Sequence, residues 1–302
     1  MNPLESCKLC PRECGVNRIA GQIGYCGMSA ELVIARVSLH MWEEPCISGV
    51  NGSGTVFFTG CPLKCVYCQN RKIAIGSTGI AVTVERLSEI FLELQQKGAH
   101  NINLVTPTHY VPQIAEALKL AKKKDLYIPI VYNTGSYEKV ETIQALEGLI
   151  DIYLPDCKYY DSGLAERYSN ASDYFDVASA VIREMVRQTG KPSFEGNLMK
   201  RGVIVRHMIL PGHTRDSRKI IEQLYTAYGN DIYISIMNQY TPLSQMKYYP
   251  EINRTITARE YEKVVDYAIS IGIENAFVQE GETAKESFIP DFESGCGIEN
   301  GK

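Results

Sequence analysis

Residues 55–70 of this 302-residue chain read TVFFTGCPLKCVYCQN, a short β-rich run followed at once by Cys61, Cys65 and Cys68. A structural zinc site or an ordinary [4Fe-4S] cluster takes four protein ligands, so three thiolates leave one metal position open to an outside ligand. This pattern indicates catalysis at an iron atom. The alternative is a zinc loop completed by a distant Cys157 or His109, although a spacing of three and two residues matches neither common zinc knuckle.

Working outward from this loop, β-rich runs alternate with helical patterns, as in parallel βα units. Apolar residues recur at helical spacing in residues 87–94 and 114–121, and Thr257 with Glu260 forms a capping-box pattern. We therefore predict an α/β fold, a TIM-like partial (β/α)6 barrel. The predicted strands are residues 55–59, 101–106, 128–133, 151–155, 203–210, 231–237 and 275–279.

Polar residues follow each predicted strand, and in a parallel barrel the loops after the strands gather on one face. We therefore expect these side chains to share one mouth of the barrel. They are Gly60 with the cysteines, then Thr106, Thr108 and His109, then Asn133, Thr134 and Ser136, then Asp156 and Lys158, then His213, then Asn238, Gln239 and Tyr240, and finally Glu280 and Glu282.

The N-terminal part departs from the βα rhythm. We predict a cysteine-rich extension and connector over residues 1–54, the barrel over residues 55–280, and an unassigned tail over residues 281–302. The extension has four potential ligands, enough to close a tetrahedral metal site that would supply folding energy to a segment with little apolar core. A structural zinc is the first choice and a second iron-sulfur cluster the alternative. The four ligands are Cys7, Cys10, Cys14 and Cys26.

Residues 40–54 connect this extension to the first barrel strand, and PCISGVNGSG at residues 45–54 has the composition of a loop. His40, Glu43, Glu44 and Cys46 are close enough in sequence to reach the barrel mouth. They either contact substrate or form a solvated, acidic connector.

Composition narrows the function classes. A formal charge of −4 and a pI near 5.8 give no general attraction to nucleic acid or anionic lipid. No stretch approaches the roughly 18 apolar residues of a membrane span, and the first residues lack a secretory signal, so we expect a cytoplasmic protein without a membrane partner. Ten cysteines in such a chain point to metal or redox chemistry, because disulfides are rare in reducing compartments.

The segment GCPLKCVYCQN resembles the cluster loop of radical S-adenosylmethionine enzymes, particularly the pyruvate formate-lyase activating enzymes and their uncharacterised relatives. The resemblance runs from CKLCPRECGVNR at residues 7–18 to the last predicted strand. It implies a [4Fe-4S] cluster on Cys61, Cys65 and Cys68 that binds S-adenosylmethionine. One electron would cleave the cofactor to methionine and a 5'-deoxyadenosyl radical, which abstracts hydrogen from a substrate.

The resemblance also implies further cofactor contacts. Tyr67 resembles the position beside the adenine, with aromatic packing as the alternative. Asp156 and Lys158 resemble the family's Asp-x-Lys pair, with a surface ion pair as the alternative. In VIVRHMILPGH, Arg206 would point toward the cofactor carboxylate, with an ion pair inside the barrel as the alternative.

One departure bears on the subfamily. Where activating enzymes carry Gly-Gly-Glu after the second strand, this chain has Thr106-Pro107-Thr108-His109 and so lacks the carboxylate that receives the cofactor's amino group. Oxygens of Thr106 and Thr108 could accept from an ammonium group, and His109 could accept or carry a proton. This departure separates the chain from typical glycyl-radical activation.

We therefore predict a radical S-adenosylmethionine oxidoreductase that acts on an unidentified substrate. A protein residue, as in glycyl-radical enzyme activation, and a small molecule are both open. An oxygen-sensitive cluster implies a flavodoxin or ferredoxin as electron donor. The alternative from another class is a zinc- or iron-sulfur-binding scaffold or electron carrier without S-adenosylmethionine chemistry.

Overall fold

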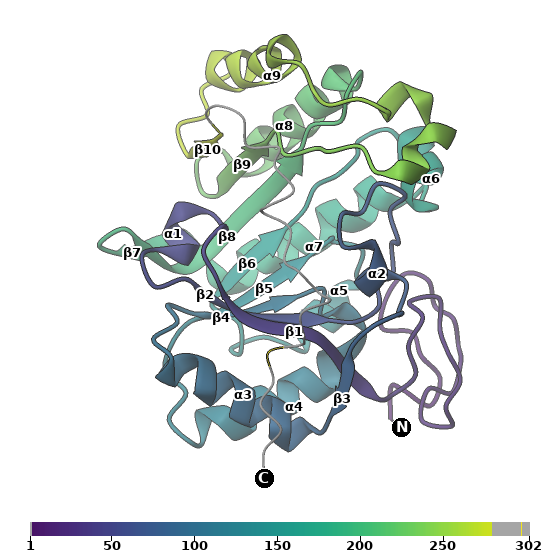
Figure 1. Ribbon diagram of the computed structural model, residues 1–302. Coiled ribbons are helices and arrows are strands. Elements are labelled where there is room, and N and C mark those ends of the chain that lie inside the picture. Colours follow the sequence, from purple (N-terminus) through teal and green to yellow (C-terminus); the bar gives the residue numbers. More distant parts are fainter. Residues whose placement is uncertain (1, 280–296, 298–302) are drawn as a thin grey trace.

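The computed structural model describes residues 2–279 and 297, and its centre is a mostly parallel β-sheet (Figure 1). All seven predicted strands are present, and each pairs in parallel with the next along the chain. Within the described residues the sheet ends at β10 on one side and β3 on the other, so the barrel stays open. The parallel strands are β2 (Ser53–Phe58), β4 (Ile102–Val105), β5 (Ile130–Thr134), β6 (Ile152–Pro155), β8 (Leu198–Met208), β9 (Tyr233–Met237) and β10 (Ala276–Val278).

Helices connect successive parallel strands and cover the outer face of the sheet. The predicted stripes are buried: Leu87 and Phe91 of α3 and Ile114 and Leu118 of α4 are fully inaccessible to solvent. The predicted capping box at the start of α9 is also confirmed. These helices are α3 (Val84–Gln96), α4 (Val111–Lys122), α5 (Val140–Gln144), α6 (Ser162–Ser169), α7 (Tyr174–Thr189), α8 (Thr214–Tyr228) and α9 (Ala258–Ser270), with three 3-10 turns at η1 (Thr108–Tyr110), η2 (Ser244–Tyr248) and η3 (Pro250–Ile252).

Antiparallel strands extend the sheet beyond β2. β1 (Leu32–His40) pairs with β2 and with β3 (Ile80–Val82). β7 (Ser193–Glu195) forms a hairpin with β8. Neither β3 nor β7 was predicted, because three mostly exposed residues leave no periodic apolar signal.

The prediction that residues 45–54 form a loop is wrong in part. The first of these residues form α1 (Pro45–Ser48), which buries Ile47 completely against Ile152 and Ile204 of the barrel strands. The glycine and serine residues suggested a loop, but one apolar turn among them fills the inside of the open barrel. A second short helix, α2 (Arg71–Ala74), follows the cysteine loop.

The N-terminal residues 2–31 contain turns and loops without a helix or strand, and in Figure 1 they lie beside α2. Arg18 attaches this segment to the barrel. Its side chain is 1% exposed and donates to the carbonyl oxygen of Ser29 in the segment and to that of His109 in the barrel. The domain boundaries stay predictions. None of the described helices combines the length and apolar character needed to cross a bilayer. Glu280, Glu282 and residues 281–296 and 298–302 lie outside the described residues.

Candidate functional site

The cysteine loop leaves the carboxyl end of β2 through a glycine that no other residue could replace without strain. Gly60 has φ +94°, and a Cβ atom there would lie 2.9 Å from the carbonyl oxygen of Cys26. The backbone amide of Cys61 donates to that same oxygen at 3.2 Å. The loop is therefore pressed against the N-terminal segment from its first residue.

Cys61, Cys65 and Cys68 all line one cavity of about 220 Å³ at this end of the sheet. The Cys61 sulfur accepts from the amide of Leu63 at 3.4 Å, and the Cys65 sulfur accepts from the hydroxyl of Ser169 at 3.0 Å. Burial raises the pKa of the Cys61 thiol to about 11 and that of the Cys68 thiol to about 12. Iron must displace these protons, because the thiolate is the ligand.

Among residues 2–279 and 297, no three histidine, cysteine or acidic side chains are arranged to hold a single metal ion. Neither residue suggested as a fourth zinc ligand lines the cavity. Cys157 packs in the main hydrophobic core, and His109 lies outside the cavity lining. The donor set of three soft thiolates on a cavity wall therefore suits an iron-sulfur cluster.

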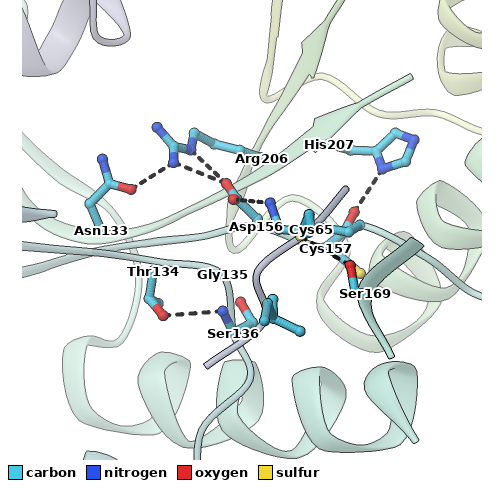
Figure 2. A network of polar contacts seen from close by, with 12 residues as sticks. Cys65, Asn133, Thr134, Gly135, Ser136, Asp156, Cys157, Ser169, Arg206 and His207 are labelled. Carbon is cyan, nitrogen blue, oxygen red and sulfur yellow. Dashed lines mark hydrogen bonds and ion pairs between the residues drawn. The ribbon is translucent and has the colours of Figure 1, made fainter. Parts of the chain in front are cut away.

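Facing the cysteines, an ionic group from β6 and β8 lines the same cavity (Figure 2). Asp156 accepts from Lys158 Nζ at 2.5 Å and from Arg206 Nε at 3.0 Å. Burial alone would raise the pKa of Asp156, but the two cations outweigh it and hold that pKa below its ordinary value. Asp156 also raises the pKa of Lys158 against the effect of burial, so all three groups are charged near neutral pH.

The segment between β1 and α1 forms a further wall of the site. Glu43 Oε2 accepts from Arg206 Nη1 at 3.2 Å, and Glu43 Oε1 accepts from Asn103 Nδ2 at 3.1 Å. The Glu43 side chain is 9% exposed and Glu44 8%, so the solvated-connector alternative is wrong for both. His40, Trp42 and Glu43 line a second cavity of about 220 Å³ that shares Asp156, Lys158, Arg206 and Tyr67 with the first.

The predicted residues after β4 divide between cavity and core. Thr106, held at φ +57°, and Thr108 line the cysteine cavity. His109 instead turns into the interior, because η1 winds the chain back toward β2, and its Nε2 lies 2.7 Å from the carbonyl oxygen of Thr59. Burial lowers the pKa of His109 to about 3, so its ring is neutral.

Tyr67 packs against other aromatic rings and also lines the candidate site. Its ring meets Tyr159, Tyr168 and Tyr240 edge-on, at centroid distances of 6.4, 6.3 and 5.9 Å. It also lines both cavities. The residue is thus a packed aromatic that presents part of its ring to the site. The other strand-end residues divide too: Asn133, Thr134 and Gln239 line a cavity, whereas His213 contacts Tyr168 at 3.0 Å.

Sequence reasoning missed Glu138, a buried carboxylate beneath the cavity wall. It is 1% exposed and accepts from the hydroxyls of Thr108 and Tyr132, both at 2.9 Å, and from that of Thr134. Burial raises its pKa to about 7 even though these hydroxyls lower it. An acid four residues beyond the end of a barrel strand was the available signal.

Hydrogen bonds reach all four N-terminal sulfurs. Cys14 accepts from the amide of Tyr25 at 3.2 Å, and Cys7 faces Arg18 Nη1 at 3.9 Å. Backbone amides of Arg12 and Met28 bond to Cys10 and Cys26. Cys14 and Cys26 flank Gly24, where a Cβ atom would lie 3.6 and 3.7 Å from their sulfurs.

Comparison with known proteins identifies the class. Residues 55–225, more than half of the chain, match the family model described as the radical SAM superfamily. The uncharacterized protein MJ0674 of Methanocaldococcus jannaschii is 30% identical over 276 residues, which cover 88% of this chain and 75% of that protein. The chain therefore belongs to the radical SAM superfamily, whose enzymes use a [4Fe-4S] cluster and S-adenosylmethionine.

Solved structures are similar to this chain at low sequence identity. Streptococcus suis SuiB bound to S-adenosylmethionine is 19% identical with a TM-score of 0.50, over 74% of this chain and 49% of that one. Methylornithine synthase (PylB) is 14% identical with a TM-score of 0.49, over 69% of this chain and 59% of that one. The chain spans about half the length of these structures.

Proposed function

We propose that this chain cleaves S-adenosylmethionine reductively and uses the resulting radical to abstract hydrogen from a substrate. The observation that carries the proposal is that Cys61, Cys65 and Cys68 share one cavity wall with the charged group of Asp156, Lys158 and Arg206. When bound, the cluster and its cofactor supply one electron and a 5'-deoxyadenosyl radical. The chain supplies the ligands, the charges and the enclosure.

Each side chain has a specific part in this proposal. The three thiolates would hold the cluster, and Tyr67 would lie beside the adenine. Lys158 and Arg206 offer positive charge to the cofactor carboxylate. Thr106 and Thr108 offer oxygen acceptors to its ammonium group, in place of the missing carboxylate. Because Arg206 already binds Asp156, Glu43 and Asn133, an incoming carboxylate must share the guanidinium or displace Glu43.

We further infer that the hydrogen donor is a residue of a protein substrate, as in glycyl-radical enzyme activation. Support comes from the wall segment of the second cavity, which exposes two large apolar side chains: Trp42 is 61% exposed and the adjacent Met41 43%. Exposed aromatic and methionine side chains suit docking of a polypeptide. A small-molecule substrate is the competing case, and the Thr106–His109 departure is compatible with it.

The proposal needs an external one-electron donor, for which a flavodoxin or ferredoxin is suitable. We also infer that Cys7, Cys10, Cys14 and Cys26 bind a second metal. Backbone amide donors to Cys10, Cys14 and Cys26 and the Arg18 guanidinium beside Cys7 support thiolate ligation. A structural zinc is the first choice for this metal and a second iron-sulfur cluster the alternative.

The test is anaerobic reconstitution with iron and sulfide, reduction with dithionite in the presence of S-adenosylmethionine, and chromatography of 5'-deoxyadenosine. We expect the product from the wild-type chain and from Cys46→Ala, a matched control at a buried cysteine outside both groups. Cys61→Ala should lose both the cluster and the cleavage activity. Cleavage retained by Cys61→Ala would contradict the assignment. A scaffold or electron carrier would instead leave S-adenosylmethionine unbound and intact with a reduced cluster.

A further inference from the structure

The C-terminal turn of α6 contacts the cysteine loop directly. The carbonyl oxygen of Tyr168 accepts from the amide of Val66 at 2.9 Å, and the hydroxyl of Ser169 donates to Cys65 Sγ at 3.0 Å (Figure 2). Arg12 fixes this turn by donating to the carbonyl oxygens of Ser169 and Pro62, both at 2.9 Å. The Ser169 hydroxyl is thus held at the sulfur by backbone contacts on both sides.

A chain of hydroxyls leads from this sulfur to the cavity. Tyr159 Oη lies 2.8 Å from Ser169 Oγ and 2.6 Å from Tyr67 Oη, and Tyr67 lines the cavity. Ser169 is 3% exposed, Tyr67 5% and Tyr159 is completely buried. Water therefore competes little for these hydroxyls, and the hydrogen bonds act in a low-dielectric environment.

Each hydroxyl carries one proton, so the charge on the sulfur decides how the chain is ordered. When the Tyr159 hydroxyl donates to Tyr67, the Ser169 hydroxyl can donate either to Cys65 Sγ or to Tyr159 Oη. A thiolate is the stronger acceptor and draws that proton to itself. Tyr159 is then free to donate to Ser169, and Tyr67 to Tyr159, which makes the Ser169 hydroxyl a stronger donor.

We propose that Ser169 is a positioning residue that raises the reduction potential of the cluster bound through Cys65, and that Tyr159 reinforces it. This inference rests on the proposed function, because it requires a cluster on Cys65. One electron enters the cluster from an external one-electron donor, and no covalent bond forms or breaks. Reduction adds negative charge to the cluster and its sulfurs, so a hydrogen bond to sulfur stabilises the reduced form more than the oxidised form.

The experiment is a redox titration of the reconstituted chain without S-adenosylmethionine, followed by electron paramagnetic resonance. Ser169→Ala should reduce the ratio of reduced to oxidised cluster roughly fivefold at the wild-type midpoint, from a hydrogen-bond difference of about 1 kcal/mol. For a one-electron couple this is about 40 mV lower. Tyr159→Phe should shift the potential by less in the same direction, and Ser169→Thr should restore it.

Ser217→Ala is the matched control, since Ser217 is 2% exposed and its hydroxyl donates to the carbonyl oxygen of His213, the N-cap residue of α8. It should leave the potential unchanged. A wild-type potential in Ser169→Ala with an intact cluster overturns the inference. If Ser169→Ala assembles no cluster, Tyr159→Phe decides: a lowered potential supports the proposal and an unchanged one refutes it. Iron and sulfide content measured first separates these results from failure of the proposed function, in which the wild-type chain binds no cluster.

Discussion

Replacing Glu138 with glutamine should change how the stability of the protein depends on pH. Its carboxyl is buried, and its pKa is raised from 4.5 to about 7. Folding therefore favours the protonated form. The stability that this preference gives is fully present below the ordinary pKa and is lost as the pH rises through about 7. A glutamine at this position carries no such pH dependence.

The size of the effect follows from the two pKa values. At 1.36 kcal/mol per pKa unit, the full difference is about 3 kcal/mol, of which about 2.5 kcal/mol falls between pH 5 and pH 8. With an unfolding entropy of about 2.1 cal/mol/K per residue, 302 residues convert this to about 4 °C in melting temperature. The melting temperature of Glu138→Gln minus that of the wild-type chain should therefore rise by about 4 °C over this range.

Differential scanning calorimetry of both reconstituted chains at one scan rate measures this difference, because other titrating groups are common to both. Glu116→Gln is the matched control on the exposed face of α4, and its difference from wild type should not follow the same course. A difference between Glu138→Gln and wild type that is constant from pH 5 to pH 8 would refute the reasoning. It would mean that the three hydroxyl donors fully compensate for burial of the charge.

Two further predictions concern the cavity walls. Asp156→Asn leaves two buried cations without their shared carboxylate, which should cost about 3–5 kcal/mol and lower the melting temperature by about 5–8 °C in calorimetry. Gly60→Ala forces a Cβ atom into the N-terminal segment at a positive φ, so iron and sulfide content should fall well below that of Gly148→Ala. Gly148 also has a positive φ, +76°, but nothing lies within 4 Å of a Cβ atom there. Gly148→Ala therefore introduces the backbone strain without the steric clash.

The parallel strands and the main helix stripes could be predicted because burial imposes their pattern on the sequence. A central parallel strand is covered on both faces, so it appears as a continuous apolar run such as IPIVYN in β5. Short exposed elements such as β3 and β7 carry no such constraint. The α1 turn was hidden for the opposite reason: Ile47 is decisive for packing, but one apolar residue among glycines and serines has no period.

The site was predictable only where its residues follow strands directly. Asp156 and Lys158 are two residues apart and end up as partners, and Arg206 sits on the adjacent strand β8. Glu43 joins the same network from 163 residues away, through a segment outside the βα repeat. Glu138 was hidden in part: Tyr132 and Thr134 are close to it in sequence, on β5, but Thr108 comes from η1 after β4. Local spacing carries no information on the contacts of Glu43 with Arg206 or of Glu138 with Thr108.

These contacts also bear on what the cysteine-rich N-terminal segment does. Its own apolar cluster contains only Leu4, Cys7 and Leu9 as buried members, too little to hold 30 residues in place. Its backbone instead binds the catalytic loop directly, through the carbonyl oxygen of Cys26 and the amide of Cys61. A metal bound by the N-terminal cysteines, as proposed above, would therefore also fix Cys61, the first proposed cluster ligand. On that proposal, loss of the N-terminal metal should loosen the cysteine loop before it unfolds the barrel.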